Sequence, residues 1–382
     1  MIVERPSLER RISASLDAGR IPVVLGACGT GRTSLLLRLE QSIGRSRAQY
    51  FDIAAAATTP ERCLTAILAA GRHVPPPGLN ASIAVESPRA SFDALMAYVD
   101  GARAGHEPVS FLFDEFLDIR TFENFPGLRH VQREFIGRLA TSPARIVLAS
   151  RFTARVHRLL RDATARFEVI HVTPLDAEDI QAMALAFDGA RRERSAELAP
   201  FVAALTGGRA AATALLLASM ANMGGASDPV AALAALFAPD AGLTARCRET
   251  YEFRLHRARG YGALKAILGV LADAEPLNLT EIAQHLRRTP GSTKDYLSWL
   301  EDVDLITSHG KRYSFEDPLL RLYVRLYGRP VPPTDDEIVR EVGGYAKARV
   351  SHLSAQIPAA VRTASPLEVT VDSGRSGIIE ID

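Results

Sequence analysis

Short apolar runs alternate with segments of helical periodicity along residues 1–175 of the chain. Five of these runs are rich in large apolar side chains, which is typical of strands buried on both faces of a sheet. They are Val23–Leu25, Gln49–Ile53, Val109–Phe116, Arg145–Ser150 and Phe167–Val172. Segments with helical spacing are Arg5–Gly19, Pro60–Arg72, Phe92–Arg103 and Val131–Ala140. The alternation predicts an α/β fold with a parallel five-stranded sheet over residues 1–175.

The pattern becomes almost purely helical after residue 175. An alanine- and leucine-rich stretch predicts an all-helical lid at residues 176–250. Two strand-like runs, Leu305–Ser308 and Arg312–Phe315, flank the turn at His309-Gly310 and predict a hairpin. Three short helices precede this hairpin, at Tyr261–Leu271, Leu279–Leu286 and Thr293–Leu300. Three helices and a two-stranded wing predict a winged helix-turn-helix domain at residues 251–328.

The last segment, residues 329–382, begins with a proline-rich linker at Pro330–Pro333. One more helix is predicted at Asp336–Ile357. Thr363–Asp382 is rich in serine, glycine and small polar residues, and it predicts a flexible tail in which Ile378–Ile381 is a candidate docking segment.

The first apolar run breaks into a glycine-rich loop, GACGTGRT, at Gly26–Thr33. A strand, such a loop and then a helix form the context of the phosphate-binding P-loop, G-x-x-x-x-G-K-[ST]. Glycines let backbone amides approach phosphate oxygens, and the helix directs its partly positive N-terminus at the same group. The Thr33 hydroxyl is also an expected Mg²⁺ ligand. The expected nucleotide-binding residues are Gly26, Gly29, Thr30, Gly31, Arg32, Thr33 and Ser34.

Arg32 stands where the P-loop pattern has lysine. Arginine keeps the positive charge, but it replaces a compact ammonium group with a wide planar fork. We therefore expect nucleotide binding to be retained and hydrolysis, if it occurs, to be slow.

Two adjacent acids, Asp114 and Glu115, follow the apolar run at Phe111–Phe113. Ligands of open parallel sheets gather at the carboxyl ends of the strands, where the glycine-rich loop also lies. Asp114 is therefore expected to support Mg²⁺, and Glu115 to polarise the water that attacks the γ-phosphate. Without this context, an acid pair is more often a strand end that reaches solvent.

Arg151 follows the strand-like run that ends at Ser150. At this edge of the sheet it is a candidate γ-phosphate sensor, and we group it with Glu115 as a catalytic residue. The alternative is a surface arginine in a basic helix, one of whose later arginines can serve a neighbouring subunit as an arginine finger. The sequence does not distinguish these interpretations. The other arginines of this helix are Arg155, Arg158 and Arg161.

The predicted lid contains the sequence Thr206-Gly207-Gly208-Arg209. A glycine pair that opens a helix beside a basic residue can fold the lid over a nucleotide. It can equally be a helix end followed by a helix start.

Basic residues of the predicted winged helix-turn-helix are candidates for contacts with DNA phosphates. Acidic residues lie among them, and no arginine or asparagine is clearly placed to read a base edge. The sequence therefore leaves two partners open for this domain, double-stranded DNA or a protein surface, including that of the N-terminal domain. The basic candidates are Arg287, Arg288, Lys294, Lys311 and Arg312.

The overall composition limits the kinds of partner, compartment and metal site that we expect. The 382 residues include 45 basic and 44 acidic side chains, so binding to nucleic acid requires a local basic patch. Three cysteines without paired spacing indicate a reducing compartment, and we expect a cytoplasmic protein. No apolar run has the length of a membrane span, no signal peptide is evident, and the scattered histidines lack metal-ligand spacing.

The order of these motifs resembles that of prokaryotic P-loop ATPases of the STAND and archaeal-type AAA group. The resemblance implies a P-loop NTPase that uses ATP and Mg²⁺ to switch a homo-oligomer or a domain arrangement, often on nucleic acid or a signalling partner. The sequence departs from the family pattern at Arg32, and at Ala210, where many relatives carry proline. The matching sequences are Arg5–Glu9, Gly26–Leu36, Asp114–Phe116, Ser150-Arg151, Thr206–Gly208 and Tyr313–Arg321.

A second interpretation of the same residues belongs to a different functional class. In it, the protein is a scaffold or DNA-binding regulator that nucleotide stabilises by mass action without being hydrolysed.

Overall fold

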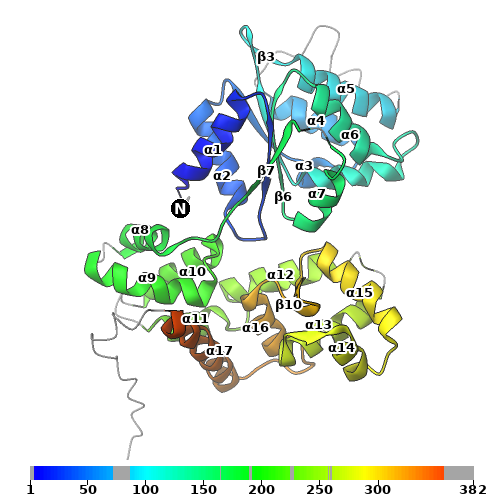
Figure 1. The fold of residues 1–382 in the computed structure, drawn as a ribbon. Coiled ribbons are helices and arrows are strands. Elements are labelled where there is room, and N and C mark those ends of the chain that lie inside the picture. Colours follow the sequence, from blue (N-terminus) through cyan, green and yellow to red (C-terminus); the bar gives the residue numbers. More distant parts are fainter. Residues whose placement is uncertain are drawn as a thin grey trace, which may run out of the picture.

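The computed structural model describes residues 4–71, 87–163, 165–188, 192–223, 228–256, 258 and 260–356 (Figure 1). The upper lobe in Figure 1 holds a sheet with helices around it, and the lower lobe consists mainly of helices from the second half of the chain. The predicted tail at Thr363–Asp382, with its candidate docking segment, lies outside the described residues.

Five parallel strands form the central sheet, in the order β2-β5-β6-β1-β7. Every residue of β1 and β5 is buried, because both faces of the sheet are covered. The prediction of a parallel five-stranded sheet in an α/β fold is therefore confirmed. The strands are β1 (Ile21–Leu25), β2 (Ala48–Asp52), β5 (Ser110–Asp114), β6 (Arg145–Ser150) and β7 (Phe167–His171).

Helices cover both faces of the sheet, as crossovers between parallel strands require. On one face, α1 (Pro6–Asp17) and α2 (Arg32–Ile43) bury residues such as Ile12 and Leu36 against Val24 of β1. The small antiparallel pair β3 (Arg103–Ala104) and β4 (Glu107–Pro108) lies between α5 and β5. The helices that contribute to the core on the other face are α3 (Ile53–Ala56), α4 (Pro60–Ala70), α5 (Pro88–Gly101), the 3₁₀ helix η2 (Phe116–Asn124), α6 (Val131–Thr141) and α7 (Thr153–Leu159).

A helical bundle follows the last strand of the sheet, as predicted. In this bundle α8 and α10 pack on α9, and α11 packs on α10. Within the described part of the chain, no helix here or elsewhere combines the length and apolar character needed to cross a bilayer. The helices are α8 (Ala177–Asp188), α9 (Arg192–Thr206), α10 (Ala210–Asn222), α11 (Pro229–Leu236) and α12 (Gly242–His256).

The next module contains three helices and a three-stranded antiparallel sheet of order β8-β10-β9. The predicted hairpin is present as β9 and β10, whereas β8 was not predicted, because two residues carry no readable alternation. In α15 the side chains of Leu297 and Leu300 are buried, that of Tyr296 is half-buried and that of Lys294 is exposed. The elements are α13 (Tyr261–Ala274), β8 (Leu277–Asn278), α14 (Leu279–His285), α15 (Pro290–Asp302), β9 (Ile306–His309) and β10 (Arg312–Phe315).

Two further helices, α16 (Pro318–Tyr327) and α17 (Asp335–Gln356), return the chain to the helical bundle, where α17 packs on α9 and α11. The Tyr345 hydroxyl donates a hydrogen bond to the carbonyl oxygen of Leu205 at 2.7 Å. Arg349 Nε donates one to the preceding carbonyl oxygen at 3.0 Å. Carbonyls in the last turn of a helix have no partner within the helix, so these two side chains of α17 supply hydrogen bonds that the C-terminal carbonyls of α9 lack.

Candidate active site

The glycine-rich loop connects the end of β1 to the start of α2. Gly29 and Gly31 have φ angles of +85° and +93°, in the left-handed region that glycine adopts at little cost. A Cβ atom on Gly26 would stand 2.6 Å from Thr30 Oγ1, so this position has no room for a side chain. No side chain in the described structure caps α2, and its first amide groups are left for a ligand. The loop therefore forms a concavity of backbone amides that suits an anion.

The Arg32 side chain lies across the base of this loop, against the two acids of β5. Its guanidinium donates to the carbonyl oxygen of Gly26 and to a carboxylate oxygen of Glu115, and its Nε lies 3.5 Å from Asp114 Oδ1. Arg32 is only 7% exposed, so these ion pairs are shielded from solvent. The sequence predicted Arg32 as a phosphate ligand, and the structure brings it to the acids that were predicted to support Mg²⁺ and water.

Asp114 meets the first turn of α2 at the carboxyl edge of the sheet. The Thr33 hydroxyl donates to Asp114 Oδ2 at 2.7 Å, and the Tyr50 hydroxyl donates to the same oxygen at 3.3 Å. Burial raises the pKa of Tyr50, and neighbouring Asp114 raises it further, so this phenol remains a proton donor. A hydroxyl and a carboxylate at one point form the hard oxygen set that Mg²⁺ prefers. The two residues predicted to hold Mg²⁺ are therefore adjacent.

Glu115 is held at both carboxylate oxygens. Arg32 donates to Oε1, and both the backbone amide and Nε of Arg151 lie 3.3 Å from Oε2. Burial raises the pKa of Glu115, although the two arginines oppose the shift. Its φ of +51° lies in the left-handed region, which is costly for a residue with a side chain and is concentrated at functional sites. The fold therefore fixes the position of this carboxylate at the expense of backbone strain.

Arg151 belongs to this cluster and not to an exposed basic surface. Besides Glu115, its guanidinium lies 3.6 Å from Asp118 and packs over the rings of Phe152 and Phe253. Arg158, farther along α7, instead pairs with Asp302 of α15. This residue belongs to the module formed by α13–α15 and β8–β10, which we call the C-terminal module. Arg151 therefore lines the cleft and is not a surface arginine of a basic helix.

The loop, the acids and the helical bundle enclose one cleft of about 450 Å³. This volume lies within the range of small-molecule pockets. Two of its charged lining residues, Asp52 and Arg246, were not selected from the sequence. Asp52 carried a usable signal, because it ends a strand at the same edge of the sheet. Arg246 carried none, because it comes from α12, far along the chain.

The glycine pair at Gly207 and Gly208 both ends α9 and opens α10. Their φ angles are +63° and +65°, and a Cβ on Gly208 would stand 2.6 Å from the carbonyl oxygen of Leu175. The turn brings the start of α10 to the loop, where the Ala211 amide donates to the Gly29 carbonyl oxygen at 3.0 Å. The glycine pair is thus a helix end followed by a helix start, and the turn it makes also brings the bundle over the glycine-rich loop.

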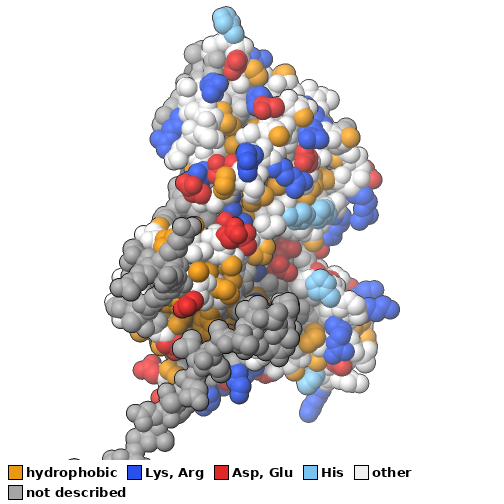
Figure 2. Space-filling view, turned by 60° about the vertical axis from the view of Figure 1, so that its left-hand side comes forward, with side chains coloured by type: hydrophobic (Ala, Val, Ile, Leu, Met, Phe, Trp, Pro, Cys, Tyr) orange, Lys and Arg blue, Asp and Glu red, His pale blue; other side chains and the backbone are white. Residues whose placement is uncertain are grey.

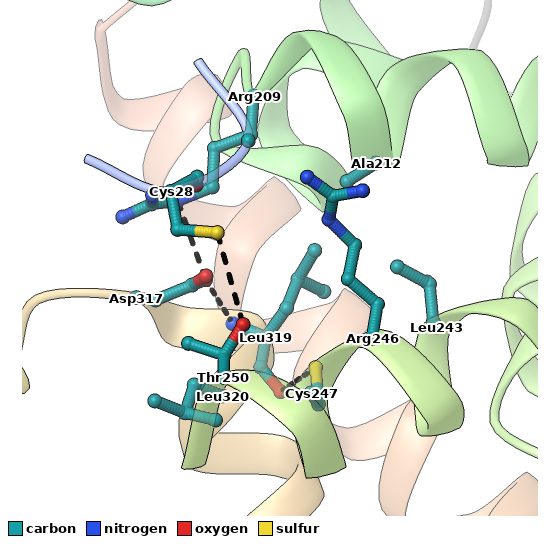
Figure 3. A pocket seen from close by; sticks show the side chains of 11 residues that line it. Cys28, Arg209, Ala212, Leu243, Arg246, Cys247, Thr250, Asp317, Leu319 and Leu320 are labelled. Atoms are coloured by element: carbon teal, nitrogen blue, oxygen red, sulfur yellow. Dashed lines mark hydrogen bonds and ion pairs between the residues drawn. The ribbon is translucent and has the colours of Figure 1, made fainter. Parts of the chain in front are cut away.

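Arg209 joins the loop to the C-terminal module (Figure 3). It donates to the carbonyl oxygens of Cys28 at 3.2 Å and Glu316 at 2.8 Å, and its Nε lies 3.3 Å from Asp317 Oδ1. A small cavity of about 30 Å³ remains beside it, with Cys28 and Asp317 among its lining residues. The glycine-rich loop, the bundle and α16 thus meet at one arginine.

The five basic residues predicted to contact DNA are all exposed on the C-terminal module. Arg312 is partly engaged, because it donates to the Pro276 carbonyl oxygen at 2.8 Å and lies 3.6 Å from Glu281. Arg288 packs over the Tyr296 ring. Figure 2 shows the Lys and Arg side chains on the outer side of this lobe as separate groups with other side chains between them. The five are Arg287, Arg288, Lys294, Lys311 and Arg312.

The fold is shared with a solved structure. The chain is similar to the Walker-type ATPase PABY2304 of Pyrococcus abyssi, with a TM-score of 0.63 and 17% identity over 85% of this chain and 96% of that chain. At this level of identity, the similarity shows a common fold alone.

Two further similarities are weaker. One is to the STAND protein PH0952 of Pyrococcus horikoshii, which has a tetratricopeptide repeat sensor, with a TM-score of 0.37 and 17% identity over 93% of this chain and 46% of that chain. The other is to the Aeropyrum pernix ORC1 protein in complex with DNA, with a TM-score of 0.41 and 14% identity over 92% of this chain and 95% of that chain. No protein-family model and no curated protein matches the sequence. The chain therefore shares its fold with a Walker-type ATPase.

Proposed function

We propose that the protein binds ATP with Mg²⁺ in the cleft and hydrolyses it slowly to change the position of its C-terminal module. One observation carries the proposal: residues 81 apart in the chain converge at one sheet edge, where the Thr33 hydroxyl lies 2.7 Å from Asp114 Oδ2. In this proposal the amides of Gly29–Arg32 bind the phosphates, with Thr33 and Asp114 as Mg²⁺ ligands. Mg²⁺, when bound, neutralises phosphate charge.

Glu115 acts as the general base in this proposal. Burial raises the pKa of its carboxyl group, which makes the carboxylate a stronger base toward water. To do so, Glu115 must first be released from Arg32 and Arg151, which hold its two oxygens. Phosphate oxygens compete for the same guanidinium groups, and Arg151 then becomes the γ-phosphate contact. The need to break two buried ion pairs is the physical reason for slow turnover.

The test compares ATP binding with phosphate release in Glu115→Gln. The variant is expected to keep the rise in melting temperature that Mg²⁺ and ATP cause in the wild type, and to lose about 10²- to 10⁴-fold in turnover. Glu123→Gln, at a partly exposed pair with Arg120, is the control and should retain turnover. Unchanged turnover in Glu115→Gln would refute the role of Glu115, and a wild type that ATP does not stabilise would refute the proposal.

The second candidate is a nucleotide-stabilised scaffold that does not hydrolyse ATP. The observation in its favour is the same double pairing of Glu115, in which an arginine already holds each carboxylate oxygen. Stabilisation of the wild type by ATP without phosphate release would select this candidate.

For the C-terminal module we propose a winged helix-turn-helix held against the ATPase lobe. The order α13, β8, α14, α15, β9, β10 is that of winged helices. Its contact with the lobe supports docking, because Asp302 pairs with Arg158 and Asp304 Oδ2 accepts the Thr153 amide at 2.9 Å.

DNA binding is the alternative function of this module. It requires affinity for duplex DNA that falls steeply as salt rises and that weakens in Lys294→Ala. No binding at low salt would leave docking as the function of the module.

A further inference from the structure

Arg246 is a cation of the cleft that belongs to neither the glycine-rich loop nor the sheet. It lies on α12, the helix that links the bundle to the C-terminal module, and it lines both the nucleotide cleft and the small cavity of Figure 3. An atom at the Cβ position of Gly29 would be 3.5 Å from Arg246 Nη2 and 3.7 Å from its Nε. The guanidinium is therefore at the tip of the loop whose amides face the cleft.

Arg246 differs from the other two arginines of the cleft in having no anionic partner. Arg32 is engaged by Asp114 and Glu115, and Arg151 by Glu115 and by a second acid. Among the described residues, none forms a hydrogen bond or ion pair with the Arg246 side chain, and no dashed line ends on it in Figure 3. A bound triphosphate would thus meet one cation whose charge is not already neutralised.

The neighbouring arginines of α12 have structural partners instead. Arg248 lies 3.2 Å from Asp240, and Arg254 donates to the carbonyl oxygen of Asp304 at 2.6 Å. The lack of a partner is therefore specific to Arg246 and is not a property of the whole basic helix.

We infer that Arg246 binds the phosphate groups of the nucleotide and adds its positive charge to those of Arg32 and Arg151, which acids already neutralise in the structure. The inference rests on the proposed function, since it assumes that ATP occupies the cleft. A nucleotide held by both the loop and Arg246 joins α2 to α12. Binding of ATP therefore fixes the helix that leads into the C-terminal module.

The first test is calorimetric titration of the full chain with Mg²⁺ and ATP. Charge-assisted hydrogen bonds of this kind correspond to about ten- to hundredfold in Kd, so Arg246→Ala should weaken binding by that factor. Arg246→Lys keeps the charge and should restore most of the affinity. Arg248→Ala is the matched control, because it removes an equal charge from the same helix, and it should bind as the wild type does.

The outcomes separate the inference from the proposed function. If the wild type binds ATP and Arg246→Ala binds it within about twofold of the wild type, the inference is wrong and the proposed function stands. Equal weakening in Arg246→Ala and Arg248→Ala would also overturn it, because the effect would then be one of overall charge. A wild type that binds no ATP refutes both.

Hydrogen exchange provides a readout that a merely structural role would not change. ATP should slow amide exchange in both α2 and α12 of the wild type. In Arg246→Ala at saturating ATP it should still slow exchange in α2 but no longer in α12. Equal protection of α12 in the two proteins would refute the proposed link.

Discussion

Replacing Arg32 with alanine is expected to be among the most destabilising single changes in the N-terminal lobe. The guanidinium neutralises Asp114 and Glu115, which are 2% and 8% exposed. Removal of one partner from a buried ion pair leaves uncompensated charge in a medium that solvates it poorly, which costs about 3–5 kcal/mol. We therefore expect Arg32→Ala to lower the free energy of unfolding by about that amount at neutral pH.

The control is an ion pair of similar geometry in solvent. Arg158 pairs with Asp302, but their side chains are 55% and 30% exposed. Water already solvates these charges, so Arg158→Ala should cost no more than about 1 kcal/mol. Urea titration followed by far-ultraviolet circular dichroism measures both variants. A loss for Arg32→Ala that is no greater than that for Arg158→Ala would refute the argument from burial.

The pH dependence of Arg32→Ala provides a second check. Burial raises the pKa of Glu115, and Arg32 opposes that rise, so its removal raises the pKa further. Between the unfolded and folded pKa values, the folded protein then holds a proton that the unfolded chain has lost, and stability falls as pH rises. Part of the deficit should therefore be recovered as the pH is lowered from about 8 to about 5. A deficit that grows at lower pH would contradict this assignment.

Three further changes test separate contacts. Gly208→Ala places a Cβ atom 2.6 Å from a backbone carbonyl oxygen, whereas Gly207→Ala at nearly the same φ meets nothing closer than 3.9 Å. Urea titration should therefore show a larger loss of unfolding free energy in Gly208→Ala, and equal losses would contradict the steric account. Burial raises the pKa of Asp304 to about 7, so ionisation of Asp304 should lower the stability of the wild type by a few kcal/mol as pH rises from about 4 to about 7. Asp304→Asn should remove this dependence of stability on pH, and an unchanged dependence would exclude Asp304 as its source. Arg209→Ala should cost about 1–3 kcal/mol and show coupling to Asp317→Asn in a double-mutant cycle, and additive losses would contradict the bridge.

The sequence predicts most of the sheet and the meeting of its two motifs. Five apolar runs identify the strands, because a strand covered on both faces has little alternative to apolar side chains. The glycine spacing identifies the loop, and Asp114 stands out because it ends such a strand. Parallel strands carry their carboxyl ends to one edge, so the contact between Thr33 and Asp114 follows from local patterns alone.

The direction of Arg32 and the role of Arg246 do not follow from local patterns. Arg32 can reach either a ligand in the loop or the acids of β5, and the choice depends on distances that only the folded chain defines. Arg246 comes from a helix that carries several arginines at similar spacing, and which of them lacks a partner depends on the positions of Asp240 and Asp304. The two-residue strand β8 exists only because β10 pairs with it.

The return of α17 to the bundle limits how the C-terminal module can move. The module enters through α12 and leaves through α16, and Tyr345 and Arg349 then secure α17 to the last carbonyls of α9. A body anchored at both of its ends has little freedom to translate, and its easiest displacement is rotation about the line that joins the two anchors. Any ATP-driven displacement of this module is therefore expected to be a hinge rotation, without separation of the module from the bundle.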